Sequence, residues 1–109
     1  MIPKLIHQYW AGGPVPDEFV GYTQGWEDLH PDWTCFLWDD EGVRGLGLYC
    51  QPLLDRAEEI SPSAPNQFRS DVLRYELLLL FGGVWVDMDL QPQKPIDELC
   101  EGSTQAWAC

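Results

Sequence analysis

The order of its segments predicts an α/β protein built on an open, mainly parallel sheet. Strand-like and helix-like segments alternate along the 109 residues, and no internal repeat interrupts them. Within residues 66–89, an apolar helical segment meets two glycines and then a strand rich in β-branched and aromatic residues. In folds of this class, ligands bind at the carboxyl ends of the strands.

Sequence patterns place each element along the chain. Strands are expected at residues 2–10, 33–38, 84–86 and 104–109, where β-branched and aromatic residues gather. Helices are expected at residues 16–30, around 49–59, at 66–81 and, as a single turn, at 96–100. Glycines and prolines separate these segments, and the two prolines within residues 91–95 exclude a central strand there.

The helix expected at residues 66–81 carries apolar side chains nearly all the way round, which is typical of a buried helix. Asp71 and Arg74 interrupt this surface, and their spacing puts them on one face. Pro65 suits the first helical turn, and Gly82 suits the left-handed residue that ends a helix. The two charges either bind a ligand or form an ion pair that satisfies only itself. We favour the ligand, because an isolated buried pair contributes little stability.

Two aspartates end the strand that follows this helix. Successive strand side chains point to opposite faces, so Asp87 and Asp89 share one face while Val84, Val86 and Met88 share the other. Like charges this close need a cation or a shifted pKa to coexist. Carboxylate oxygens suit a hard divalent ion, so Asp87 and Asp89 are predicted metal ligands.

The spacing of these aspartates limits how they can share one ion. In a straight strand they lie roughly 6.6–7 Å apart, which is too far for both to ligate one ion tightly. Either the chain bends, since Gln91 and Pro92 end the strand just beyond, or Asp89 ligates directly and Asp87 reaches the ion through water or the ribose. Metal affinity without nucleotide is therefore expected to be weak.

Three segments carry a resemblance to a known family. The sequences S-D-V-L-R-Y (70–75), G-G-V-W-V-D-M-D (82–89) and I-H-Q-Y-W-A-G-G (6–13) resemble the DXD-containing sugar transferases. That family includes yeast-type α-mannosyltransferases and, more distantly, the clostridial glucosylating toxins. A lone D-x-D is weak evidence, whereas this whole arrangement is much more specific. The resemblance implies a Rossmann-like nucleotide-sugar-binding fold of the GT-A type, in a small or truncated version, with residues 1–109 as a single donor-binding domain.

The resemblance also implies a reaction and roles for five residues. The chain is expected to be a hexosyltransferase that uses a UDP- or GDP-sugar and retains the anomeric configuration. Manganese, or magnesium, at Asp87 and Asp89 would neutralise charge on the leaving diphosphate. Arg74 would donate to sugar or phosphate oxygens and Asp71 would accept from sugar hydroxyls, so Asp87, Asp89 and Arg74 are the expected catalytic residues. Trp10 and Asp87 would contact the nucleotide, Trp10 by stacking on its base.

The residues alone leave some of these roles open. Trp10 is equally compatible with a core aromatic residue. His7 is expected to be a packed or hydrogen-bonded core residue, because no second ligand lies at a metal-like spacing. Asp39 and Asp40 follow a strand, where capping of the next helix is favoured over contact with a ribose.

Composition limits the partners and the compartment. The chain has 18 acidic and 6 basic residues, for a formal net charge of −12. This charge repels nucleic acid and anionic membranes, so neither is an expected partner, and a diphosphate would need an offsetting cation. No segment is apolar enough to span a membrane and no secretory signal precedes the first strand, so a cytoplasmic location is expected. The four cysteines form no C-x-x-C pair, which argues against zinc.

The length of 109 residues suits one domain but is small for a transferase that holds both donor and acceptor. Three functions therefore remain open: a metal-dependent glycosyltransferase, a non-catalytic nucleotide-sugar-binding domain, and a subunit that completes its acceptor site with a partner in an oligomer. The resemblance favours the first. The acceptor, a carbohydrate or a protein, is not indicated.

Overall fold

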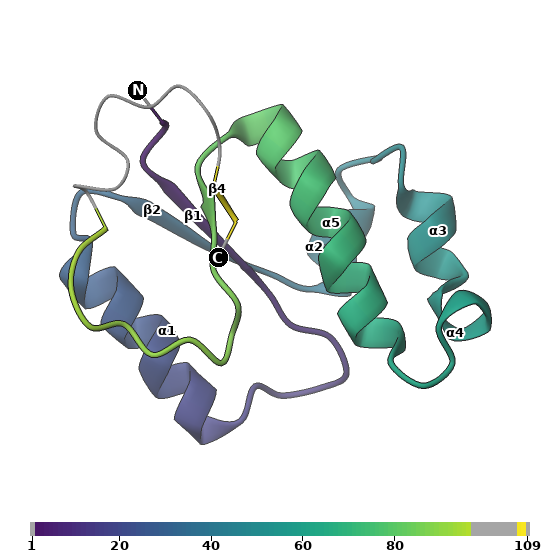
Figure 1. Ribbon diagram of the computed structural model, residues 1–109, viewed down its shortest axis with the longest axis horizontal. Helices are drawn as coiled ribbons and strands as arrows, with labels where there is room; N and C mark the ends of the chain where they lie inside the picture. The colour runs from purple at the N-terminus through teal and green to yellow at the C-terminus, as the bar shows by residue number, and fades with distance from the viewer. Residues whose placement is uncertain (1, 97–106, 109) are drawn as a thin grey trace.

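The computed structural model describes residues 2–96 and 107–108 and shows a parallel sheet with helices around it (Figure 1). The strand order is β2-β1-β3-β4, and every pairing is parallel. The strands are β1 (Leu5–Tyr9), β2 (Thr34–Trp38), β3 (Val84–Trp85) and β4 (Trp107–Ala108). The helices are α1 (Asp17–Leu29), α2 (Asp40–Arg44), α3 (Gln51–Asp55), α4 (Ala57–Ile60) and α5 (Pro65–Phe81). The predicted open, parallel α/β sheet is confirmed.

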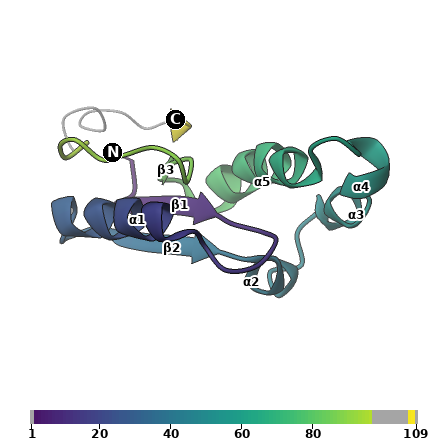
Figure 2. The same cartoon turned by 90° about the horizontal axis from the view of Figure 1, so that it is seen from below.

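Both faces of the sheet carry apolar side chains, because the strands alternate their side chains between two separate clusters. On one face, Ile6 and Val84 pack with Trp26 of α1. On the other, Trp85 packs with Leu73 of α5. Figure 2 shows α1 running alongside β1 and β2, whereas α2, α3, α4 and α5 gather toward the carboxyl ends of these strands. No helix among the described residues is long and apolar enough to cross a membrane.

The expectation that the long helix is buried nearly all round is wrong. Leu73 and Leu77 are fully buried, but Tyr75 is 72% exposed and Leu79 is 84% exposed. Two residues along a helix correspond to a rotation of about 200°. Tyr75 and Leu79 therefore face away from the layer that buries Leu73 and Leu77. Apolar composition did not reveal that the side of α5 with Tyr75 and Leu79 is exposed.

The remaining boundaries differ from the sequence predictions by small amounts. Helix α2 was not expected as a separate element, although the predicted cap is present: the Asp39 carboxylate accepts from the Gly42 amide at 2.8 Å. Pro65 opens α5 as predicted. Strand β3 ends at Trp85, one residue early. The turn predicted at 96–100 and the start of the strand at 104–109 lie outside the described residues, apart from Ile96.

His7 is a buried, hydrogen-bonded core residue, as predicted. Trp38 Nε1 donates to His7 Nδ1 at 3.2 Å, so the neutral ring carries its proton on Nε2 and donates to the Gly82 carbonyl at 2.9 Å. Its ring also stacks on Phe36 of β2, with centroids 5.4 Å apart. One side chain thus ties β1 to β2 and to the glycine pair that precedes β3.

This arrangement predicts a pH dependence of stability. Burial lowers the pKa of His7 from its ordinary value of 6.5. As the pH falls below 6.5, the unfolded chain binds a proton at His7 more readily than the folded chain does. The stability that is present above pH 6.5 is therefore lost progressively as the pH falls toward the lower pKa of the folded state. Urea unfolding in neutral and in mildly acidic buffer should show a larger loss for the native chain than for His7→Gln. Equal losses in the two proteins would exclude His7 as the cause.

Candidate active site

A pocket of about 510 Å³ opens where the carboxyl ends of β1 and β3 meet. The chain that leaves β1 crosses to β2 on one side of it, whereas β3 pairs with β1 on the other side, so the strand order reverses at this point. In open α/β sheets such a switch point is the usual ligand site. The pocket is lined by residues of both strand ends, α1 and α5: Tyr9, Trp10, Ala11, Gly12, Phe19, Asn66, Gln67, Ser70, Trp85, Val86, Asp87, Met88 and Asp89.

Asp87 and Asp89 both line this pocket, and a turn brings them there. The Leu90 amide donates to the Asp87 carbonyl at 3.1 Å, so the chain leaves the extended conformation directly after β3. The chain therefore turns at the two aspartates instead of continuing as a straight strand, and their sharing of one ion stays a prediction. No group of three or more His, Cys, Asp or Glu residues within the described part of the chain could hold a metal ion. Two carboxylates suit a hard cation whose remaining ligands come from water or a bound molecule.

Helix α1 fixes the chain that follows this turn. Trp26 Nε1 donates to the Leu90 carbonyl at 3.0 Å, and the Ile96 amide donates to His30 Nε2 at 3.0 Å. Gly25 makes room for the ring of Pro92, because a Cβ at Gly25 would lie 2.7 Å from it. Sequence reasoning missed this support, although the four-residue spacing of Trp26 and His30 places them on one helix face.

Trp10 belongs to the pocket wall and is half-buried. Phe19 of α1 meets its ring edge-on, with centroids 5.8 Å apart. The buried Nε1 of Trp10 has no hydrogen-bond partner among the described residues. The structure therefore places Trp10 in the wall of the same pocket as the two carboxylates, and its stacking on a base stays a prediction.

Asp71 and Arg74 form an ion pair with each other. Arg74 Nη2 lies 3.2 Å from Asp71 Oδ1, and their side chains are 23% and 47% exposed, so the pair is only partly buried. Gln67 Nε2 also donates to Asp71 Oδ1, at 2.9 Å. Asp71 borders a second, apolar hollow on α5, and neither partner of the ion pair is among the described residues that line the pocket. Their predicted contact with the donor sugar stays a prediction.

The pocket also contains residues that sequence reasoning missed. Asn66, Gln67 and Ser70 form one face of the first turns of α5, at the spacing that joins neighbours on a helix. Tyr9 donates its hydroxyl to Asp40, and burial together with this carboxylate raises the pKa of Tyr9. None of the described residues that line the pocket is basic, so its only formal charges are the two carboxylates.

Comparison with known proteins identifies a family and several relatives. The family described as the glycosyltransferase sugar-binding region containing a DXD motif matches residues 16–106. The chain is 36% identical over 98 residues to inositol phosphoceramide mannosyltransferase 3 of Schizosaccharomyces pombe. This alignment covers 90% of the chain and 27% of that protein. It is 34% identical over 108 residues to an initiation-specific alpha-1,6-mannosyltransferase of Candida albicans, covering 93% of the chain and 28% of that protein.

A third relative is a mannosyl phosphorylinositol ceramide synthase of Saccharomyces cerevisiae, 35% identical over 100 residues, which are 91% of this chain and 26% of that protein. The chain thus spans about a quarter of the length of these curated relatives. No solved structure shows a significant match. The family match covers most of the chain and includes both aspartates of the pocket. The chain belongs to the glycosyltransferase family whose sugar-binding region contains the DXD motif.

Proposed function

We propose that the pocket binds a nucleotide-diphosphate sugar together with a divalent cation, as the donor site of a glycosyltransferase. The observation that carries the proposal is the lining of the pocket, which combines an aromatic wall at Trp10 with two carboxylates and, among the described residues, no basic side chain. A diphosphate placed beside Asp87 and Asp89 is repelled unless a cation offsets the charge. The pocket volume of about 510 Å³ lies within the ordinary range for ligand sites.

The two carboxylates fit such a cation, and other residues of the site would hold the base and the aspartate turn. Manganese or magnesium at Asp87 and Asp89 would offset the charge that develops on the leaving diphosphate. Trp10 would hold the base, and Phe19 would hold the ring of Trp10 in place. The α1 contacts at Leu90 and Ile96 would keep the aspartate turn from moving when the ligand arrives.

The proposed donor and stereochemistry rest on the resemblance to the family. The relatives are named as mannosyltransferases, so a hexose is proposed, with mannose as the first sugar to test. We propose a UDP- or GDP-linked donor and retention of the anomeric configuration, which the anomer of the product would reveal by NMR. A non-catalytic binding domain would bind the same donor without turning it over. A cytoplasmic location stays a prediction from composition.

A thermal-shift screen tests the proposal directly. GDP, UDP and their mannose- and glucose-linked forms are added to the chain with manganese. A ligand that binds only the folded state raises the apparent stability, by about 2.7 kcal/mol at a hundredfold excess over its Kd. At least one nucleotide should raise the melting temperature with manganese present. The absence of a shift with every one of them would contradict the proposal.

Substitution of Trp10 gives a more local prediction. Trp10→Ala should weaken binding of the nucleoside diphosphate by about 1–3 kcal/mol, the usual range for loss of a stacking contact. Trp10→Phe keeps an aromatic face and should lose less. Calorimetry provides both affinities, and urea unfolding shows whether the fold is intact. Equal affinity in a folded Trp10→Ala variant would assign Trp10 to the core instead.

Asp71 and Arg74 can be tested by comparing two ligands. If they hold the sugar, Asp71→Asn and Arg74→Gln should weaken binding of the nucleotide sugar more than binding of the bare nucleoside diphosphate. If they form only a structural pair, each change should affect both ligands alike and should lower the free energy of unfolding. Because the pair is partly exposed, that loss should stay within about 1 kcal/mol.

A further inference from the structure

The wall of the pocket contains a carboxamide whose orientation is fixed by its neighbours. Asn66, in the first turn of α5, lines the pocket. Arg69 Nη1 donates to Asn66 Oδ1 at 2.8 Å. A guanidinium group has only donors, so the atom that faces Arg69 must be the carboxamide oxygen. The Nδ2 amino group of Asn66 therefore points away from Arg69.

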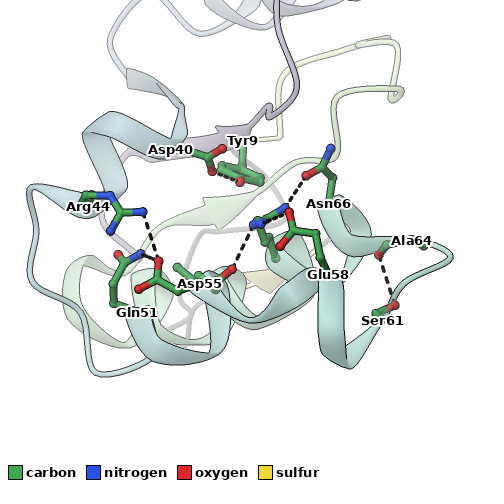
Figure 3. A network of polar contacts seen from close by, with 11 residues as sticks. Tyr9, Asp40, Arg44, Gln51, Asp55, Glu58, Ser61, Ala64 and Asn66 are labelled. Carbon is green, nitrogen blue, oxygen red and sulfur yellow. Dashed lines mark hydrogen bonds and ion pairs between the residues drawn. The ribbon is translucent and has the colours of Figure 1, made fainter.

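Arg69 is itself held in place from two other directions. Its Nη2 donates to Glu58 Oε1 of α4 at 2.5 Å, and its Nε donates to the Leu54 carbonyl of α3 at 3.2 Å. Its side chain is only 14% exposed. Figure 3 shows this network, with the Asn66 oxygen facing it and the Asn66 nitrogen facing the other way. Elements α3, α4 and α5 together determine which end of the carboxamide is presented.

The amino group of Asn66 lies against the loop that follows Trp10. A Cβ built on Gly12 would be 3.3 Å from Asn66 Nδ2, and Gly12 lines the same pocket. No protein atom among the described residues accepts a hydrogen bond from Nδ2. The neighbouring Gln67 differs, because its own amino group donates to Asp71. Asn66 thus offers an uncommitted N–H donor in a pocket whose charged groups are two carboxylates.

We propose that Asn66 is a further donor-binding residue and that Arg69 positions it. This inference rests on the proposed function. Asn66 Nδ2 donates a hydrogen bond to an oxygen of the nucleotide sugar, and the contact with Arg69 keeps the acceptor end of the carboxamide turned away. A neutral amide suits this role, because it binds phosphate, hydroxyl or carbonyl oxygens without competing with Asp87 and Asp89 for the cation.

Calorimetry with manganese and GDP, UDP or their mannose-linked forms tests the role of Asn66. Asn66→Ala should weaken binding of the nucleotide by roughly twofold to twelvefold, the range for one lost hydrogen bond. Asn66→Asp keeps an acceptor for Arg69 but has no donor, so it should lose at least as much affinity while its unfolding midpoint stays native. Gln24→Ala is the matched control: it trims a carboxamide of α1 that lies outside the pocket lining and donates to Asp28, and it should change affinity less than twofold.

A double-mutant cycle tests the role of Arg69. Arg69→Met should also weaken nucleotide binding, and adding it to Asn66→Ala should weaken binding no further, because Arg69 acts through Asn66. Additive losses would overturn the positioning role. The smallest ligand whose affinity falls in Asn66→Ala identifies the oxygen that accepts the hydrogen bond. A loss already seen with the nucleoside indicates an oxygen of the base or ribose, and a loss first seen with the nucleoside diphosphate indicates a phosphate oxygen. A loss seen only with the nucleotide sugar indicates a sugar hydroxyl.

Failure of this inference is distinguishable from failure of the proposed function. If the native chain binds nucleotide with manganese but Asn66→Ala and Asn66→Asp bind it equally well, only the role of Asn66 is overturned. If the native chain binds none of these nucleotides, the proposed function fails, and the role of Asn66 fails with it.

Discussion

Gly83→Ala is expected to lower the free energy of unfolding by about 2–6 kcal/mol, the sum of backbone strain and overpacking. Gly83 has a φ of +97°, in a backbone region that residues other than glycine rarely adopt. A Cβ there would lie 2.5 Å from the Leu5 carbonyl oxygen and 2.8 Å from the Leu5 Cβ. Leu5 begins β1, and β1 pairs with the strand that starts directly after Gly83. Neither partner can move without disturbing the centre of the sheet.

Gly21→Ala is the matched control for this prediction. Gly21 lies within α1, where an added Cβ meets no heavy atom within 4 Å. Alanine in the middle of a helix is more stable than glycine by roughly 0.5–1 kcal/mol. Urea unfolding of both variants measures the difference. A Gly83→Ala protein as stable as the native chain would contradict the close packing of the glycine break against β1.

Asp89→Asn is expected to abolish most of the coupling between metal and nucleotide. Coupling between two ligands typically amounts to about 1–3 kcal/mol, or 5–150-fold in affinity. Asparagine keeps the volume of the side chain but removes the charge that offsets the cation. In calorimetry, the nucleoside diphosphate should bind Asp89→Asn with nearly the same affinity with and without manganese.

Asp28→Asn separates a local effect from a change of overall charge. It removes one negative charge from the surface of α1, where Asp28 accepts from Gln24, and it leaves the pocket lining unchanged. This variant should keep the full response to manganese. A similar loss in both variants would show that net charge, rather than ligation by Asp89, produces the coupling.

Short-range patterns in the sequence were enough to predict the helix, glycine pair and strand that lead to the two aspartates. The glycine pair, the apolar strand and the two aspartates are contiguous, so their placement depends on short-range rules: positive φ at Gly82 and Gly83, and strand alternation up to Trp85. The parallel sheet follows from the alternation of helices and strands. A ligand site at the carboxyl ends of the strands follows from that fold class, and the structure places the pocket at β1 and β3.

Features that depend on distant contacts were not predictable in this way. The outward face of α5 looks like the inward face in composition, because leucine occupies both. The orientation of Asn66 depends on Glu58, which lies on another helix and reaches it only through Arg69. The support of the aspartate turn depends on Trp26, 64 residues before Leu90. No motif in the sequence records such pairings.

The most direct test of the account is the affinity of the native chain for a nucleoside diphosphate, measured by calorimetry with manganese and again with an excess of chelator. The pocket lining offers the diphosphate two carboxylates and, among the described residues, no basic side chain. Affinity should therefore fall at least fivefold in chelator, the low end of ordinary coupling. Equal affinity under both conditions would contradict the account, because it would show that the diphosphate binds without a cation at Asp87 and Asp89.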